Sequence, residues 1–136
     1  MITITSADNK EYVEIGGTDI LKSAYSTAKV RLSSISREIE SALTFLHTGE
    51  CNCKDALMVA RQLNLIRDGL ASISPDKAIY DADNPGKKAP WEGNISPIVT
   101  SCANMYTTAD GKDLFAVFVR ILSYAYYTKN SLSTNA

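Results

Sequence analysis

The chain has 136 residues, of which 45% are hydrophobic, and we expect residues 1–136 to form a single domain with one core. Fourteen basic residues against fifteen acidic ones give a net charge of −1, which argues against a general affinity for nucleic acid or anionic membranes. The first residues lack a secretory pattern, and no segment stays apolar for the roughly 18 residues of a membrane span, so we expect a soluble, cytoplasmic protein.

The first predicted elements are a short β-hairpin and a helical run. Residues 1–17 alternate with period two around the polar turn ADNK, with apolar packing candidates at Ile2, Ile4, Tyr12 or Val13, and Ile15. Two strands alone are marginal in water, so helices must cover them. After a candidate cap at Thr18, apolar residues recur every three or four positions over 18–47. The serines at 33, 34 and 36 leave open whether this helix is continuous.

A second helix and a long loop are predicted next. Gly49 is placed to end the first helical run, and Asn52 with Asp55 can begin a helix that stops near Ser74. Residues 75–97 contain all four prolines and form a loop, and loops of this length are usually functional or disordered. We expect an ordered loop because it holds three large aromatic or aliphatic residues, Tyr80, Trp91 and Ile95.

Two further helices are predicted after the loop. Residues 96–105 begin with Ser-Pro, a suitable cap and first-turn pair, and are predicted to form a short helix. Asp110, with Asp113 three residues later, can cap the last helix over 112–130, whose apolar face is wider than usual. The predicted fold class is α+β, mainly α: a short N-terminal β-hairpin packed on about four helices, with a long ordered loop before the last two helices.

The stretch DADNPGKKAPWE, residues 81–92, has the outline of an EF-hand calcium loop. Counted from Asp81, it has acids at positions one and three, glycine at six and glutamate at twelve. Position five should supply a side-chain oxygen but is Pro85, and the lysines at 87 and 88 put positive charge where a dication should sit. We therefore expect no metal here and interpret the acids as members of a polar loop.

The patterns for other chemical sites are also incomplete. His47 with Cys51 and Cys53 has the chemistry of zinc ligands but not their usual spacing. An odd number of cysteines suits thiols in a reducing compartment. We find neither a nucleophile motif nor a glycine-rich phosphate loop, and basic residues are scattered among acidic ones. We expect no cofactor, no metal, no catalytic residue and no nucleic-acid partner, with a pair of Cys102 and His47 as an open alternative.

Three consecutive motifs carry a family resemblance. The sequence SPDK is followed by the acidic piece AIYDAD, then by PWEGNISP over 90–97, and then by TADGKDLF over 108–115. In these motifs the chain resembles the immunity protein 70 family, small proteins encoded beside bacterial polymorphic toxins. The resemblance covers residues 75–118, and residues 16–70 fit the family in arrangement.

The resemblance implies a non-enzymatic protein that binds one toxin domain, encoded by an adjacent gene, and blocks its active site or an essential surface. As toxin-binding residues we select aromatic and acidic members of the loop, Tyr80, Asp81, Asp83, Trp91 and Glu92. If the toxin is a basic nuclease, the three acids can face its cationic cleft. The alternatives are a helical adaptor or regulatory domain without a toxin partner, and a small cysteine- or histidine-dependent enzyme. The oligomeric state stays open.

Overall fold

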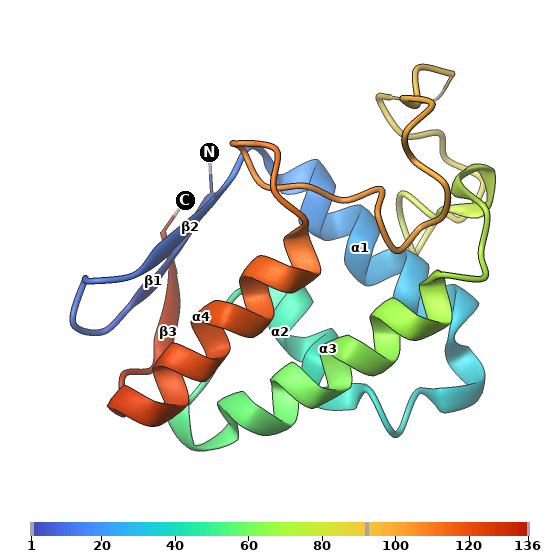
Figure 1. Cartoon of the computed structure of the whole chain (residues 1–136). Helices are drawn as coiled ribbons and strands as arrows, with labels where there is room; N and C mark the ends of the chain where they lie inside the picture. The colour runs from blue at the N-terminus through green and yellow to red at the C-terminus, as the bar shows by residue number, and fades with distance from the viewer. Residues whose placement is uncertain (1, 92, 136) are drawn as a thin grey trace.

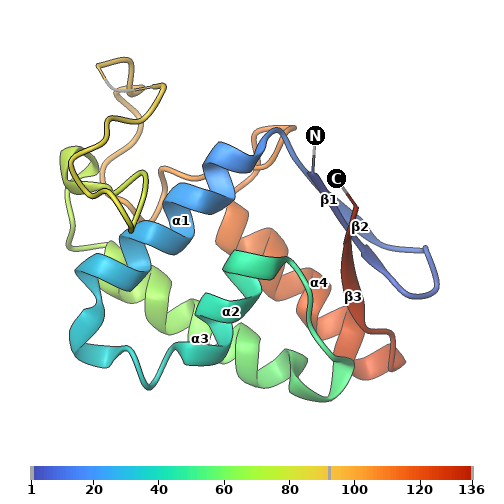
Figure 2. The ribbon, with the colours of Figure 1, turned by 180° about the vertical axis from the view of Figure 1, so that it is seen from behind.

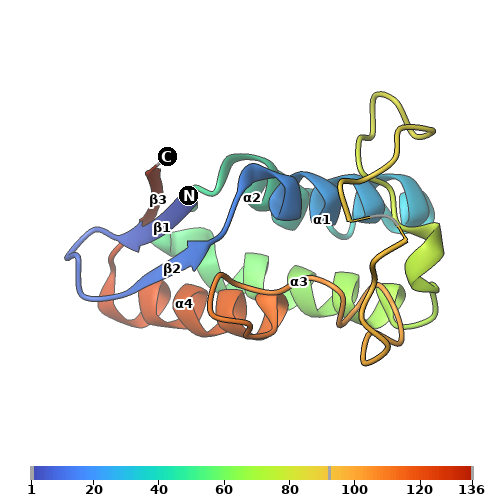
Figure 3. The ribbon, with the colours of Figure 1, turned by 90° about the horizontal axis from the view of Figure 1, so that it is seen from above.

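The helices pack in two layers, with a small sheet at one end of the molecule and a long loop at the other (Figure 1, Figure 3). The computed structural model describes residues 2–91 and 93–135. Within them, the regular elements are β1 (Ile2–Ser6), β2 (Tyr12–Ile15), α1 (Thr18–Arg31), α2 (Glu40–Thr48), α3 (Ala56–Leu70), α4 (Leu114–Thr128) and β3 (Leu132–Asn135). Short 3-10 turns lie at Ser33–Ile35, Cys53–Asp55 and Pro75–Lys77. This is the predicted α+β fold, mainly α.

The predicted N-terminal hairpin is confirmed, and it belongs to an antiparallel sheet with the strand order β2-β1-β3. In this sheet Ile4 of β1 lies opposite Val13 of β2 and Thr134 of β3. Ile4, Val13 and Ile15 are buried, because alternate residues of the hairpin face the helices. The sequence pattern does not predict β3, since LSTN is too short and too polar to show the alternation of a strand.

The helical run over 18–47 is broken in the structure. α1 ends at Arg31 and α2 begins at Glu40, with the serine-containing segment between them (Figure 2). Leu32 and Ile39, which lie in this connection, are both buried. A continuous helix would be about 45 Å long and would extend beyond a domain of this size. The break instead lets α1 and α2 pack against each other.

Helix ends differ from the prediction at three places. Asp113, and not Asp110, caps α4: its carboxylate accepts hydrogen bonds from the backbone amides two and three residues later, at 3.0 and 3.3 Å. α1 starts after Gly17, which makes no side-chain cap, so the cap predicted at Thr18 is wrong. α3 ends at Leu70, four residues earlier than expected.

The short helix predicted for 96–105 is also wrong. These residues form turns, and the side chain of Asn104 accepts hydrogen bonds from the backbone amides of Thr100 (3.0 Å) and Ser101 (3.2 Å). An asparagine side chain that captures amides in this way competes with the backbone bonds of a helix. The ordered loop therefore runs on to the start of α4, and one helix follows it instead of two.

The hydrophobic core lies between the two helical layers and one face of the sheet. The wide apolar face of α4 is confirmed, since Phe115 and Phe118 are both fully buried in this core. Phe118 meets Phe45 of α2 edge to face, with the ring centroids 5.1 Å apart. Among the described residues, every buried side-chain nitrogen or oxygen has a hydrogen-bond partner. None of the helices described is both long enough and apolar enough for a membrane crossing.

Gly49 ends α2 as predicted, in a left-handed conformation with φ of 72°. A Cβ atom at this position would lie 2.1 Å from Oγ1 of Thr134, which donates a hydrogen bond to the Thr48 carbonyl (2.7 Å). We expect Gly49→Ala to lower the free energy of unfolding by about 1–2 kcal/mol for the backbone conformation, and by more because the Thr134 side chain must move and give up its hydrogen bond. Gly111→Ala is the control, since Gly111 has φ of 83° and open space around it. Equal losses in urea denaturation of the two variants would contradict this assignment.

Asp8, in the turn of the hairpin, connects the sheet to the end of α4. Its carboxylate accepts hydrogen bonds from the hydroxyls of Ser6 (2.6 Å) and Tyr124 (2.5 Å), and these bonds lower its pKa from 3.8 to about 2. The folded-state pKa is depressed, so this contribution to stability is present above about pH 4 and is lost as the pH falls toward 2. We expect the melting temperature of the Asp8→Asn variant to fall less steeply than that of the wild type as the pH is lowered through this window. The exposed control Asp68→Asn should keep the wild-type slope, and equal slopes in all three proteins would contradict the prediction.

Candidate functional site

The loop that follows α3 is attached to α1 by buried hydroxyl groups. The backbone amide of Ile79 donates to Oγ1 of Thr27 (2.8 Å), and Oγ of Ser23 donates to the Ile79 carbonyl (3.0 Å). The hydroxyl of Tyr106, from the far end of the same loop, lies 2.8 Å from both of these side-chain oxygens. All four residues are buried. Both ends of the loop are therefore bonded to the same two positions of α1.

The geometry of this attachment follows from the spacing of two residues on α1. Ser23 and Thr27 are four residues apart and so lie on one face of α1, one turn from each other. Burial raises the pKa of Tyr106 to about 12, so its hydroxyl stays protonated and can donate at any physiological pH. Hydrogen bonds in a buried network of this kind are costly to leave unmade. The network thus holds the loop in one arrangement over α1.

Tyr80 and Trp91, two of the predicted toxin-binding residues, come together in this loop. Their rings meet edge to face, with centroids 6.1 Å apart and planes at 85°. The hydroxyl of Tyr80 donates to the carboxylate of Asp19 at the start of α1, and this bond raises the pKa of Tyr80. Both rings are partly exposed, and Trp91 also packs against the core. The pair therefore presents aromatic surface on a fixed base.

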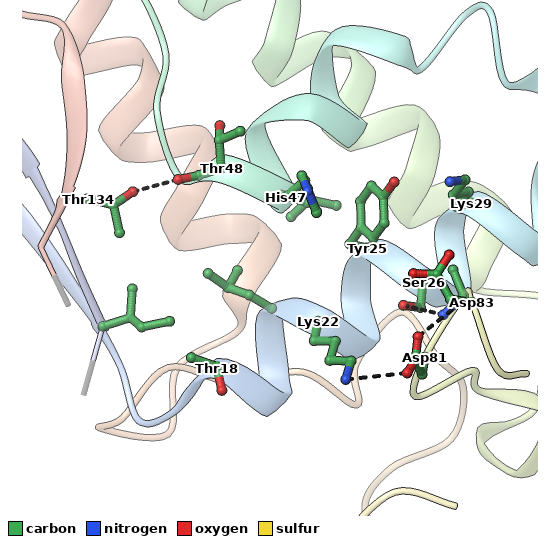
Figure 4. A pocket seen from close by; sticks show the side chains of 14 residues that line it. Thr18, Lys22, Tyr25, Ser26, Lys29, His47, Thr48, Asp81, Asp83 and Thr134 are labelled. Carbon is green, nitrogen blue, oxygen red and sulfur yellow. Dashed lines mark hydrogen bonds and ion pairs between the residues drawn. The ribbon is translucent and has the colours of Figure 1, made fainter. Parts of the chain in front are cut away.

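The predicted acids Asp81 and Asp83 lie on the other side of Tyr80, in a groove of about 540 Å³ between α1, α2 and the loop (Figure 4). Nζ of Lys22 lies 3.5 Å from the Asp81 carboxylate, and the Asp83 amide donates to the same carboxylate at 3.0 Å. The hydrogen bond from the Asp83 amide is the main reason that the pKa of Asp81 is lowered, and the positive charge of Lys22 lowers it further. The amide of Ala82 donates to Oγ of Ser26 (3.0 Å), which fixes this side of the loop to α1. Asp83 is exposed.

The opposite wall of the groove is aromatic and basic. Tyr25 of α1 and His47 of α2 face each other with ring centroids 4.8 Å apart (Figure 4). Nζ of Lys29 lies 5.5 Å from the centroid of the Tyr25 ring, in the range of a cation–π contact. The groove therefore combines carboxylates on one wall with two basic groups and a tyrosine on the other. This arrangement suits polar contacts with another protein.

The alternatives based on cysteine and histidine receive no support from this geometry. Burial raises the pKa of Cys51 and of Cys102 to about 11, so both remain protonated thiols at neutral pH and are poor nucleophiles. The Cys102 thiol donates to the carbonyl of Ser74 (3.4 Å), while His47 packs on Tyr25. In the ranges 2–91 and 93–135, no three His, Cys, Asp or Glu side chains form a group that could hold a metal ion.

The structure divides the predicted site residues into two pairs. Tyr80 and Trp91 form the aromatic contact, whereas Asp81 and Asp83 line the groove beside α1. Glu92 lies outside the described residues. The sequence pattern does not predict the side chains of α1 and α2 that complete the groove. These are Lys22, Tyr25, Ser26, Lys29 and His47. Their helical spacing puts the first four on neighbouring positions of α1, but nothing in the sequence indicates that the loop packs there.

Comparison with known proteins is consistent with the resemblance found in the loop motifs. The family described as immunity protein 70 matches residues 5–133, a range that extends from β1 to β3 and includes every helix and the long loop. Neither the curated proteins nor the solved structures that were compared gave a match. The chain therefore belongs to the immunity protein 70 family.

Proposed function

We propose that this protein binds a cognate toxin domain directly, without enzymatic chemistry, and so protects the cell that produces both proteins. The observation that carries this proposal is the family match over residues 5–133, because immunity proteins act on toxins as a class. We further propose that the partner is encoded by an adjacent gene and that the two proteins meet in the cytoplasm.

The long loop is the part of the molecule best suited to this binding. Its buried bonds to α1 hold it in place, so that little conformational entropy is lost when a partner binds. Tyr80 and Trp91 offer the aromatic anchors that are enriched at the centres of protein interfaces. Asp83 is exposed and Asp81 is partly exposed, which places carboxylates at the rim, where they can meet the basic groups of a nuclease toxin.

Co-expression tests the proposed function. The toxin domain of the adjacent gene is induced in a sensitive bacterial strain with and without this protein, and growth is followed. We expect growth only when this protein is present, and we expect the two purified proteins to co-elute from a sizing column. An unrelated toxin domain is the control and should kill in both cases. Death of the cells despite good expression of this protein would reject the proposal.

A further inference from the structure

A second groove lies on the Trp91 side of Tyr80 and has a volume of about 590 Å³. One wall is the 3-10 turn at Pro75–Lys77 with the segment that follows it, and the other wall is the turn that leads to Trp91. The aromatic pair Tyr80 and Trp91 contributes apolar surface to this groove, together with Ile79 and Ile95. Figure 1 shows that this part of the loop projects from the helices at the end opposite the sheet.

The charged side chains around this groove are mainly positive. Arg31, Lys87 and Lys88 line it against one carboxylate, Asp76, so these described residues carry a net charge of +3 − 1 = +2. The whole chain carries −1, so the groove differs in sign from the protein as a whole. A positive potential in a concave apolar site attracts anionic groups.

Two of the cations are held where they can bind such a group. Nε of Arg31 donates to the Lys77 carbonyl (2.9 Å), which orients the guanidinium and leaves its other N–H groups available to a carboxylate. Nζ of Lys87 lies 5.6 Å from the centroid of the Tyr80 ring, so the cation stands beside the aromatic surface. A ligand that fits both features has a carboxylate next to an apolar side chain.

We propose that this groove binds an acidic segment of the toxin, with an apolar side chain against Tyr80 and Trp91 and carboxylates at Arg31, Lys87 and Lys88. This inference rests on the proposed function and adds the chemistry of the partner. The sequence leads us to expect acids of this protein near Trp91 that face a cationic cleft of the toxin. The inference assigns the opposite charges to this side of the loop, with basic residues on this protein and acidic residues on the toxin. Asp81 and Asp83 line the groove beside α1 instead.

Two other occupants fit the groove less well. A second copy of the chain in a two-fold symmetric contact would place these cations near their own equivalents, and like charges repel. Single-stranded nucleic acid also uses aromatic and basic residues, but it binds along a positive track that follows several phosphates, and the whole chain carries a net charge of −1. The observations therefore favour a protein segment.

The experiment compares wild-type protein with the variant Lys87→Glu/Lys88→Glu, using the purified toxin domain of the adjacent gene as the probe. Affinity is measured by calorimetry at low and at moderate salt concentration. We expect the variant to bind at least about tenfold more weakly at low salt, and its binding should no longer weaken as salt is added, because like charges now face each other and salt screens their repulsion. The control Lys54→Glu/Arg61→Glu makes the same change in net charge at exposed positions before and within α3 and should bind like the wild type. Melting curves check that all three proteins are folded.

The outcomes separate this inference from the proposed function. If both variants protect cells and bind with wild-type affinity, the acidic segment is rejected while the immunity function stands. If the wild-type protein itself does not bind the toxin domain, both are rejected. Recovery of binding by the Lys87→Glu/Lys88→Glu variant, after acidic residues of the toxin are exchanged for lysine, supports the groove. If a single-stranded RNA oligonucleotide binds the wild type and not this variant, with toxin affinity unchanged, the groove belongs to nucleic acid and the inference is wrong.

Discussion

Replacement of Tyr106 by alanine is expected to lower the free energy of unfolding by about 3–5 kcal/mol, the usual range for loss of a large buried aromatic side chain. Tyr106 is fully buried, and its ring meets Phe115 edge to face, with centroids 6.5 Å apart. Its hydroxyl also joins the two ends of the loop through Ser23 and Thr27. Urea denaturation followed by circular dichroism measures the change.

The matched variant Tyr106→Phe separates the packing of the ring from the hydrogen bonds of the hydroxyl. Ser23 and Thr27 keep their bonds to Ile79 in this variant, so we expect a loss of only about 1 kcal/mol. We also expect faster hydrogen exchange at the Ile79 amide, because one of the groups that closes the network is gone. Equal losses of stability for the alanine and phenylalanine variants would mean that packing of the ring contributes little.

Replacement of Trp91 by alanine is expected to weaken binding of the toxin domain by about 30-fold or more, which corresponds to roughly 2 kcal/mol for a central aromatic anchor. Trp91 is partly exposed, meets Tyr80 edge to face, and lines the groove that also contains Arg31, Lys87 and Lys88. The side chain also packs on the core, so its loss will lower stability as well. Affinity is therefore measured by calorimetry well below the melting temperature of the variant.

The control for this prediction is Tyr12→Ala. Tyr12 is an aromatic residue with 57% of its surface exposed, and it lies on β2, at the end of the molecule opposite the part of the loop that projects from the helices (Figure 1). We expect it to bind the toxin domain like the wild type. If Trp91→Ala also binds like the wild type while remaining folded, Trp91 serves only to attach the loop and the interface lies elsewhere.

Local patterns in the sequence were sufficient for the elements whose residues repeat with a clear period. The alternation around Ile4 and Val13 predicts the hairpin, and the spacing of apolar residues predicts the positions of α3 and α4. Gly49 ends α2 because this position has a positive φ, which glycine adopts without steric cost. These signals arise from neighbours in the chain, so a single sequence is enough to detect them.

The predictions that failed did so for two different reasons. Residues 96–105 begin with a good helix start, but the Asn104 side chain binds the amides that a helix would need. β3 has no pattern of its own and exists because β1 pairs with it, over more than a hundred residues of chain. The first is a local competition that a helix-start pattern does not reveal, whereas the second is a long-range pairing that leaves no trace in the local sequence.

For the candidate site, the sequence by itself determined which residue types the loop offers and, through the motifs of 75–118, the family to which the chain belongs. The tertiary structure alone decided how those residues are distributed. Ser23 and Thr27 hold the loop at Ile79, with Asp81 and Asp83 in the groove beside α1 and with Tyr80 and Trp91 in the basic groove. Arg31 lines that groove although it is about 60 residues from Trp91 in the chain. It does so because the buried hydroxyl network fixes the loop across α1.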